Sequence, residues 1–155
     1  MTDNQLRPGA ENWRIAIVVA QFNPTITGML LEGTRATLAN AGVADDHAQV
    51  FAVPGAWELP LASQRLAESG RFDAIIALGA VVRGETAHFD FISTECARGL
   101  QQVSLETGIP VAFGVLTPEN GEQAIERADP KRKNKGREVA AAAMDMIAFN
   151  AEVAP

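Results

Sequence analysis

The sequence predicts a doubly wound α/β sandwich, in which helices cover both faces of a four-stranded parallel sheet. Short segments rich in Val, Ile and Ala alternate along the chain with longer segments of helical spacing. The short segments are apolar on both faces, which is typical of a parallel sheet buried between two layers of helices. At 155 residues, of which 47% are hydrophobic, the chain is long enough to form one domain with a proper core.

The predicted strands and helices follow one another in order. The strands are expected in "RIAIVVAQF", "QVFAVPG", "DAIIALGAVV" and "IPVAFGVLT", which are residues 14–22, 49–55, 73–82 and 109–117. Three helices are expected between them, at residues 25–42, 58–70 and 88–108, followed by a short helix at 119–127 and a last one at 137–150. This order indicates a flavodoxin-like arrangement. Residues 1–13 form an N-terminal extension to a single domain at residues 14–150.

Glycine, proline and capping residues mark the helix ends. Gly42, Gly70 and Gly108 are expected to stop the first three helices, because glycine readily adopts the left-handed conformation at a helix end. Asn23 before Pro24 is a helix start, since it puts an N-cap residue ahead of a proline at the first helical position. Thr117 before Pro118 has the same pattern and predicts the start of the short helix.

Composition excludes several classes of function. No apolar run approaches the roughly 20 residues that span a bilayer, and the N-terminus lacks the pattern of a signal peptide, so we expect a cytoplasmic protein without a membrane partner. The net charge of −6 argues against a nucleic-acid partner. The lone Cys96 lies within a predicted helix, which favours an inert, partly buried thiol over a nucleophile.

Polar residues gather where the third predicted strand ends, in "RGETAHFDF" at residues 83–91. In this fold ligands collect at the carboxyl ends of the strands, next to helix N-termini. Thr86 is a reasonable N-cap for the following helix, and it puts His88 in the first turn, where the helix dipole favours the neutral imidazole. A histidine that only packs or caps fits the spacing equally well. Glu85 and His88 resemble a metal pair, but no further ligands accompany them, so no metal is expected.

A basic run, "RADPKRKNKGR" at residues 127–137, stands out in this acidic chain. It holds six of the thirteen cationic residues and all three lysines. Such a run is most often a solvated face. The alternative is a binding surface for an anionic small molecule.

Five ordered blocks of sequence resemble the lumazine synthase family. They are "VVAQFN", "VPGAWELP", "GAVVRGETAHFDF", "FGVLTPENGEQAIERA" and "NKG", and the similarity runs from about Arg14 to Phe149. The resemblance implies a transferase of riboflavin biosynthesis, which condenses 5-amino-6-(D-ribitylamino)uracil with 3,4-dihydroxy-2-butanone 4-phosphate. The products would be 6,7-dimethyl-8-ribityllumazine, phosphate and water, formed by way of an imine, loss of phosphate and ring closure. The family uses no metal and no organic cofactor.

The resemblance also implies roles for individual residues. His88 matches the residue that transfers protons, and a neutral imidazole suits that task. Phe22 matches an aromatic side chain that stacks on the pyrimidine ring. The other positions bind the pyrimidine and ribityl group (Asn23, Ala56, Trp57, Glu58, Gly79, Ala80, Val81, Val82 and Phe113) or the phosphate (Glu85, through its backbone, Thr86, Arg127 and Lys135).

Members of the family build these sites between subunits, which implies a homo-oligomer based on pentamers. Phe113, Arg127 and Lys135 would then come from a neighbouring subunit, and riboflavin synthase is a further partner that the resemblance suggests. The alanine-rich last helix offers a close-packing surface for such an assembly. The segment at 128–136 differs from the small, glycine-bearing loop of shell-forming members, so the resemblance does not predict a shell.

Two alternatives to catalysis stay open. Trp57 stands where the family frequently has Phe, and a second aromatic side chain in the pocket would suit a protein that binds a flavin or lumazine without turning it over. A purely structural shell protein is the other alternative. Measuring turnover of the two substrates distinguishes the first alternative from an enzyme, and measuring particle size tests the second.

Overall fold

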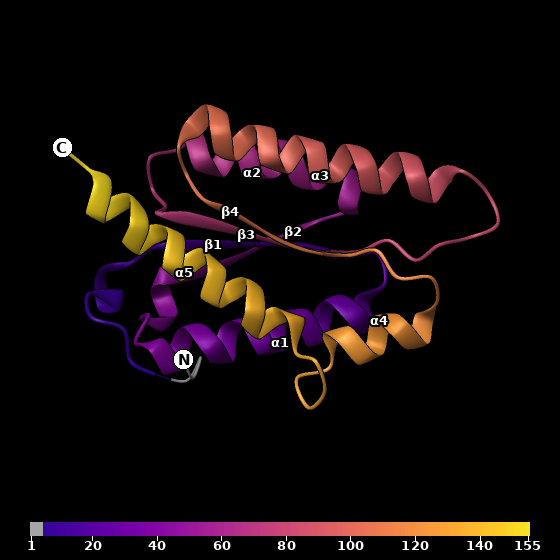
Figure 1. The fold of residues 1–155 in the computed structure, drawn as a ribbon, viewed down its shortest axis with the longest axis horizontal. Helices are drawn as coiled ribbons and strands as arrows, with labels where there is room; N and C mark the ends of the chain where they lie inside the picture. The colour runs from indigo at the N-terminus through magenta and orange to yellow at the C-terminus, as the bar shows by residue number, and fades with distance from the viewer. Residues whose placement is uncertain (1–4) are drawn as a thin grey trace.

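Four parallel strands form a single sheet at the centre of the computed structural model, which describes residues 5–155 (Figure 1). The strands are β1 (Ile15–Ala20), β2 (Ala48–Val53), β3 (Ala74–Ala80) and β4 (Val111–Leu116). Their order across the sheet is β2-β1-β3-β4, and all three neighbouring pairs are parallel. The predicted α/β fold with a four-stranded parallel sheet is therefore confirmed.

Five α-helices of the described residues cover the sheet in two layers. α1 (Pro24–Ala41), α4 (Gly121–Ala128) and α5 (Lys135–Val153) lie on one face, and α2 (Leu59–Glu68) and α3 (His88–Thr107) lie on the other (Figure 1). Short 3₁₀ helices, which the sequence did not predict, occur at η1 (Ala10–Asn12), η2 (Asp45–His47) and η3 (Ala56–Glu58). The crossover from β1 to β2 uses α1, whereas the crossovers to β3 and β4 use α2 and α3, so the sheet is wound in both directions.

The core consists of two apolar clusters, one on each side of the sheet. Ile15 and Ile17 of β1 belong to the cluster under α1 and α5, and Ala16 and Val18 belong to the cluster under α2 and α3. This division follows from the period of two along a strand, which points successive side chains to opposite faces. β1 and β3 are buried throughout, as predicted, but β2 is half exposed because it is an edge strand.

Glycine ends the first three long helices as predicted, and one predicted helix start is wrong. Gly42, Gly70 and Gly108 all have positive φ angles at or just after a helix end. The short helix α4 does not begin at Thr117, because the buried Pro118 uses its carbonyl oxygen to accept a hydrogen bond from the backbone N–H of Arg83, at 3.0 Å. The helix begins at Gly121, after Asn120 has capped it by accepting a hydrogen bond from the backbone N–H of Gln123 at 2.9 Å.

The alanine-rich helix α5 packs within its own chain. Gly136 allows this close approach, because a Cβ atom there would overlap the carbonyl oxygen of Leu30 in α1. Ala140 and Ala143 are buried in the cluster between α5 and the sheet. Ala140 and Ala143 therefore cover the core of their own chain, whereas Ala142 is exposed, so a contact of this helix with another subunit stays a prediction for its exposed side.

The N-terminal segment, as far as the structure describes it, packs against the domain. Residues 1–4 of the predicted extension lie outside the described residues. The backbone N–H of Arg7 donates to the carbonyl oxygen of Ala41, and its guanidinium pairs with Asp145. Ala10 is fully buried against the end of α1. Across residues 5–155, no helix is both long and apolar enough to cross a membrane.

Candidate active site

A cavity of about 910 Å³ opens at the carboxyl ends of β1, β2 and β3. The chain leaves β1 and β3 towards opposite faces of the sheet, and this divergence leaves a crevice between them, which is where doubly wound folds bind ligands. We call it the first cavity. Its lining residues are Phe22, Asn23, Pro54, Gly55, Ala56, Trp57, Glu58, Ala80, Val81, Val82, Gly84, Thr86, His88, Phe89, Phe91 and Ile92.

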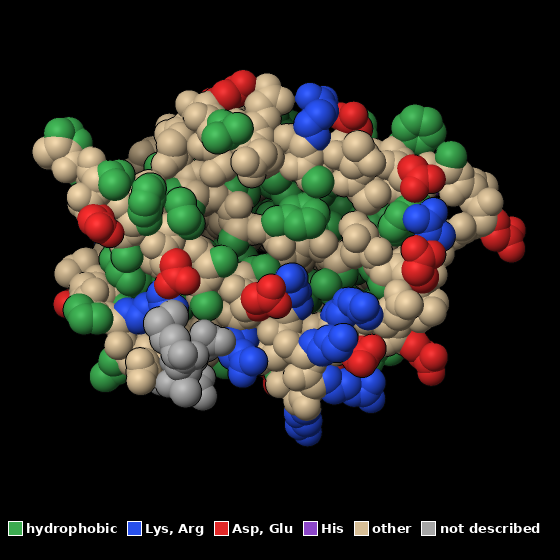
Figure 2. All heavy atoms as spheres, viewed as in Figure 1, with side chains coloured by type: hydrophobic (Ala, Val, Ile, Leu, Met, Phe, Trp, Pro, Cys, Tyr) green, Lys and Arg blue, Asp and Glu red, His purple; other side chains and the backbone are tan. Residues whose placement is uncertain are grey.

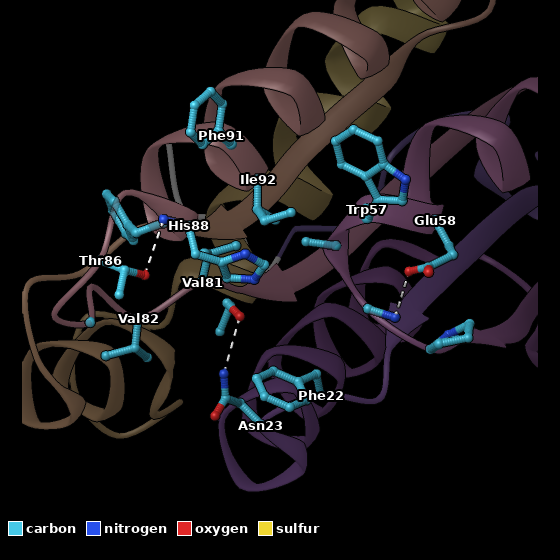
Figure 3. Close-up of a pocket in the computed structure, with 16 residues that line it drawn as sticks. Phe22, Asn23, Trp57, Glu58, Val81, Val82, Thr86, His88, Phe91 and Ile92 are labelled. Atoms are coloured by element: carbon cyan, nitrogen blue, oxygen red, sulfur yellow. Dashed lines mark hydrogen bonds between the residues drawn. The ribbon is translucent and has the colours of Figure 1, made fainter.

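Asn23 ties the ends of β1 and β3 together at the base of this cavity. It adopts a left-handed conformation, with φ of 63°, and its side-chain amide donates to the carbonyl oxygen of Ala80 at 3.2 Å (Figure 3). It stands at the N-cap position of α1, as predicted, but makes no side-chain capping hydrogen bond. The bond to Ala80 holds the two strand ends at a fixed separation instead.

Aromatic side chains form two walls of the first cavity. Phe22 follows β1 and is 72% exposed, and Trp57 lies in η3 and is 58% exposed. The turn that carries Trp57 is held by Glu58, whose carboxylate accepts a hydrogen bond from the backbone N–H of Gly55 at 3.1 Å (Figure 3). The two rings give the cavity flat apolar surfaces of the kind that stack on planar heterocycles.

His88 is the first residue of α3, so its predicted place in the first helical turn is confirmed. Its imidazole points towards the space between Phe22 and Trp57 (Figure 3). The N-cap residue is Ala87 rather than the predicted Thr86, but the Thr86 hydroxyl accepts a hydrogen bond from the backbone N–H of His88 at 3.3 Å. The proton-transfer candidate therefore sits beside a helix N-terminus, which also favours a bound anion.

A second cavity, of about 560 Å³, lies beyond the end of β4. Arg127 and Lys135 line it, and both are half-buried. The Arg127 guanidinium donates to the carbonyl oxygen of Gln123 at 3.2 Å, and the Lys135 ammonium lies 2.9 Å from a carboxylate oxygen of Glu138. The full lining consists of Phe113, Val115, Leu116, Thr117, Pro118, Glu119, Gln123, Arg127, Lys133, Lys135 and Glu138.

The basic run therefore divides between a cavity and the surface. Figure 2 shows Lys and Arg side chains gathered near the junction of α4 and α5. Lys131 is exposed, and so is Arg132, which pairs with Asp129 at 3.6 Å. Lys131 lies on the solvated surface, and Arg132 is exposed at the edge of a separate hollow of about 830 Å³ that Lys133 also lines, whereas Arg127 and Lys135 face the second cavity.

The structure brings most of the predicted site residues into one of the two cavities. Phe113, Arg127 and Lys135 line the second cavity, and Gly79 and Glu85 line neither. Gly79 lies inside the sheet, where a Cβ atom would press against the side chain of Leu59 at 3.2 Å. The other ten predicted residues line the first cavity: Phe22, Asn23, Ala56, Trp57, Glu58, Ala80, Val81, Val82, Thr86 and His88.

Sequence analysis missed several lining residues. Phe91 and Ile92 line the first cavity from the same face of α3 as His88, which their spacing of three and four residues could have indicated. Lys133 and Glu138 line the second cavity. Nothing in the sequence distinguishes Lys133 from its exposed neighbours in the basic run.

Neither a metal centre nor a reactive thiol is visible in the described part of the chain. Residues 5–155 contain no group of three or more His, Cys, Asp or Glu side chains placed to hold a metal ion. Cys96 lies in α3 and is buried, and this burial raises the pKa of its thiol to about 11. The thiolate is therefore scarce near neutral pH, which agrees with the expected inert cysteine.

Comparison with known families agrees with this geometry. The family model of 6,7-dimethyl-8-ribityllumazine synthase matches residues 12–151, which is nearly the whole chain. The matched region contains the complete sheet, all five α-helices except the last two residues of α5, and both cavities. The protein therefore belongs to the 6,7-dimethyl-8-ribityllumazine synthase family.

Proposed function

We propose that this protein condenses 5-amino-6-(D-ribitylamino)uracil with 3,4-dihydroxy-2-butanone 4-phosphate to form 6,7-dimethyl-8-ribityllumazine. The observation that carries the proposal is the position of His88, which begins α3 and points between two aromatic side chains of the first cavity (Figure 3). A planar pyrimidine, a polyol chain and a phosphate require an aromatic surface, polar groups and an anion site. The two cavities together contain all three.

The first cavity suits the pyrimidine substrate. Its volume of about 910 Å³ lies within the range of small-molecule sites. The ring of Phe22 is exposed enough to stack on the heterocycle, and the backbone of residues 80–82 can pair with its polar edge. Asn23 and Glu58 then face the ribityl hydroxyls. Glu58 also holds the 54–58 turn through the N–H of Gly55, so it would bind the ribityl chain from a fixed position.

The butanone phosphate would lie across the N-terminus of α3. Its phosphate would accept hydrogen bonds from Thr86 and the backbone at Glu85, with Arg127 and Lys135 neutralising its charge. This position puts the reacting carbons near His88. The amine and the ketone form an imine with loss of one water, elimination then releases phosphate and leaves an enol that becomes a carbonyl, and the second nitrogen attacks this carbonyl and closes the ring with loss of a second water. His88 would carry protons between these steps.

The separation of the two cavities supports an active site shared between subunits. In one chain, Phe113, Arg127 and Lys135 line a different cavity from His88. A neighbouring subunit could supply the second set, as the family resemblance implies. We therefore propose a homo-oligomer built on pentamers, whose mass light scattering would measure. A stable and fully active monomer would contradict the shared site.

Turnover of the two substrates tests the proposed function directly. The purified protein should form a fluorescent lumazine only when both substrates are present. His88→Ala should lower the single-turnover rate by about 10²-fold, the lower end of the usual contribution of proton transfer, because a bound amine and ketone still react slowly. Binding of both substrates without any product would reject the enzyme.

A second candidate function is the binding of a flavin or lumazine without turnover. The observation in its favour is Trp57, which adds a second large aromatic surface to the first cavity opposite the Phe22 side. Titration with riboflavin would measure this directly. Tight riboflavin binding together with an absence of lumazine formation would favour the binding protein over the enzyme.

A further inference from the structure

Arg83 lies between the two cavities and lines neither of them. It follows β3 by three residues, and its backbone N–H donates to the carbonyl oxygen of Pro118 at 3.0 Å. Together with Phe89, Phe113, Thr117 and Glu119, its side chain lines a smaller hollow of about 400 Å³. Since Arg83 lines neither the first nor the second cavity, its contacts with residues of both need a separate explanation.

The guanidinium of Arg83 makes contacts in two directions. Its Nε lies 2.8 Å from a carboxylate oxygen of Glu119, which lines the second cavity. On the other side, Nη1 lies 3.5 Å from Asp90, and the Cζ atom lies 4.3 Å from the ring centroid of Phe89, which lines the first cavity. Phe89 and Asp90 directly follow His88 in the first turn of α3.

The contacts continue from Glu119 to the phosphate candidate Arg127. The backbone N–H of Glu119 donates to the side-chain oxygen of Gln123 at 2.8 Å. The carbonyl oxygen of Gln123 in turn accepts a hydrogen bond from the Arg127 guanidinium at 3.2 Å. One continuous chain of contacts therefore connects the start of α3 with Arg127.

The chemistry of arginine suits this position. A planar guanidinium can present donors to two carboxylates at its edges while its face stacks on an aromatic ring, and a lysine ammonium cannot do both. Each ion pair is partly exposed, with the Arg83 side chain 41% accessible, so each pair alone contributes little to stability. The three contacts together instead restrict how the first turn of α3 can move relative to Glu119.

We propose that Arg83 is a positioning residue, which fixes the first turn of α3, including His88, relative to the loop after β4 and to Arg127. The kinetic part of this inference depends on the proposed function. If each active site combines the first cavity of one subunit with the second cavity of the next, this chain of contacts also connects neighbouring active sites within the oligomer.

Arg83→Gln tests the proposal, because it removes the charge and the forked donors but keeps a polar side chain. Small displacements of reacting groups can cost up to about 10²-fold in rate, so we expect kcat to fall by roughly 10-fold. The KM for the butanone phosphate should rise by about 3- to 10-fold, since its anion site adjoins the displaced turn. The KM for the pyrimidine should stay within about 2-fold, because Phe22 and Trp57 lie on other elements.

Arg98→Gln is the matched control. Arg98 lies on α3, the helix that Arg83 contacts, and pairs with Glu95 at 2.7 Å, but it is 67% exposed and lines neither cavity. The control should leave kcat and both KM values unchanged. Arg83→Lys should recover only part of the lost rate, because it restores the charge without the planar fork.

A double-mutant cycle shows whether Arg83 acts through Glu119. Glu119→Gln removes the same ion pair from the other side and leaves α3 untouched. If the contact carries the effect, the double variant should be about as slow as Arg83→Gln alone, and not slower by the product of the two single effects. Multiplying effects would overturn the proposal, and so would an Arg83→Gln variant with wild-type kcat and KM values.

Amide hydrogen exchange separates this proposal from the proposed reaction. Exchange at residues 86–91 should be faster in Arg83→Gln than in the wild type and in Arg98→Gln. This measurement needs no substrate, so it remains valid if the wild type forms no lumazine. Unchanged exchange at these residues would overturn the positioning role, whatever the protein catalyses.

Discussion

Two variants damaged in different cavities should restore each other's activity when they are assembled into one oligomer. His88→Ala damages the first cavity, and Arg127→Ala damages the second. If one active site combines the first cavity of a subunit with the second cavity of its neighbour, some sites in a mixed ring contain no substitution. Those sites need His88 from an Arg127→Ala subunit and Arg127 from a His88→Ala subunit.

The expected recovery follows from counting neighbours. In a ring assembled at random from equal amounts of both variants, about a quarter of the interfaces join the two intact half-sites. Oligomers made of one variant alone should be much less active. Activity should fall about 10²-fold in His88→Ala, and roughly 10- to 150-fold in Arg127→Ala, which loses a charge-assisted contact of about 1.5–3 kcal/mol. Mixed oligomers should therefore approach about 25% of wild-type activity. This is at least twice the activity expected of the more active parent variant.

The assay compares variants that were unfolded and refolded together with the same variants refolded separately and then pooled. Lumazine formation is measured in both samples at a saturating concentration of the pyrimidine and at a butanone phosphate concentration well below its wild-type KM, so that a loss of phosphate affinity lowers the rate. A mixture of His88→Ala with Thr86→Ala is the control, because both residues line the first cavity and no neighbour can restore it. This control should show no recovery.

One result would refute the shared site. If the mixed sample is only as active as the average of its parents, while light scattering shows that mixed oligomers formed, His88 and Arg127 do not combine across a subunit boundary. The two residues would then have to act within one chain, or Arg127 would have no part in the reaction.

Two further predictions concern Arg127 and Cys96. Arg127→Ala should raise the apparent dissociation constant of the butanone phosphate by roughly 10- to 150-fold and leave pyrimidine binding unchanged, whereas Arg132→Ala should change neither, because Arg132 is an exposed partner of Asp129. Separate titrations of each substrate check this, and equal effects of the two substitutions would put the phosphate elsewhere. The raised pKa of Cys96 means that the unfolded thiol, at about 9.0, loses its proton before the folded one, at about 11. The stability contributed by the buried neutral thiol is therefore complete below about pH 9 and is lost between about pH 9 and 11. Over that range the free energy of unfolding should fall by about 2–3 kcal/mol more in the wild type than in Cys96→Ala. Parallel pH profiles in chemical denaturation would contradict this.

The sheet and its helices were predictable because their signals are local. Buried parallel strands require apolar residues on both faces, and this pattern identified all four strands to within a few residues. Gly42 and Gly108 end their helices for a reason that depends only on backbone conformation. Thr117 failed as a helix start because the carbonyl of Pro118 pairs with Arg83, which is distant in sequence. Tertiary pairing of this kind leaves no trace in a single segment.

The site residues that directly follow strand ends could be predicted from the sequence. Contacts that depend on how helices and side chains pack could not. His88 and Phe22 follow strands that end at the same edge of the sheet, so their convergence could be inferred from the order of elements. The burial of Ala140 and Ala143 against the core of their own chain could not be predicted, since composition alone does not show which element they meet. The separation of Arg127 from His88 was expected only from the family resemblance, because spacing in the sequence does not distinguish one cavity from two.

The surfaces around the two cavities connect assembly with chemistry. Phe22, Trp57 and Phe91 line the first cavity yet are largely exposed in one chain, Phe91 at 69%. Large apolar side chains grouped at a rim mark a surface that meets another molecule. The second cavity offers Arg127 and Lys135, whose charges would be desolvated by a neighbour and matched by a bound phosphate. A subunit contact that joins these surfaces would cover the aromatic rim and exclude water from the phosphate at the same time. Substrate binding and subunit association should then stabilise each other, because both depend on the same side chains.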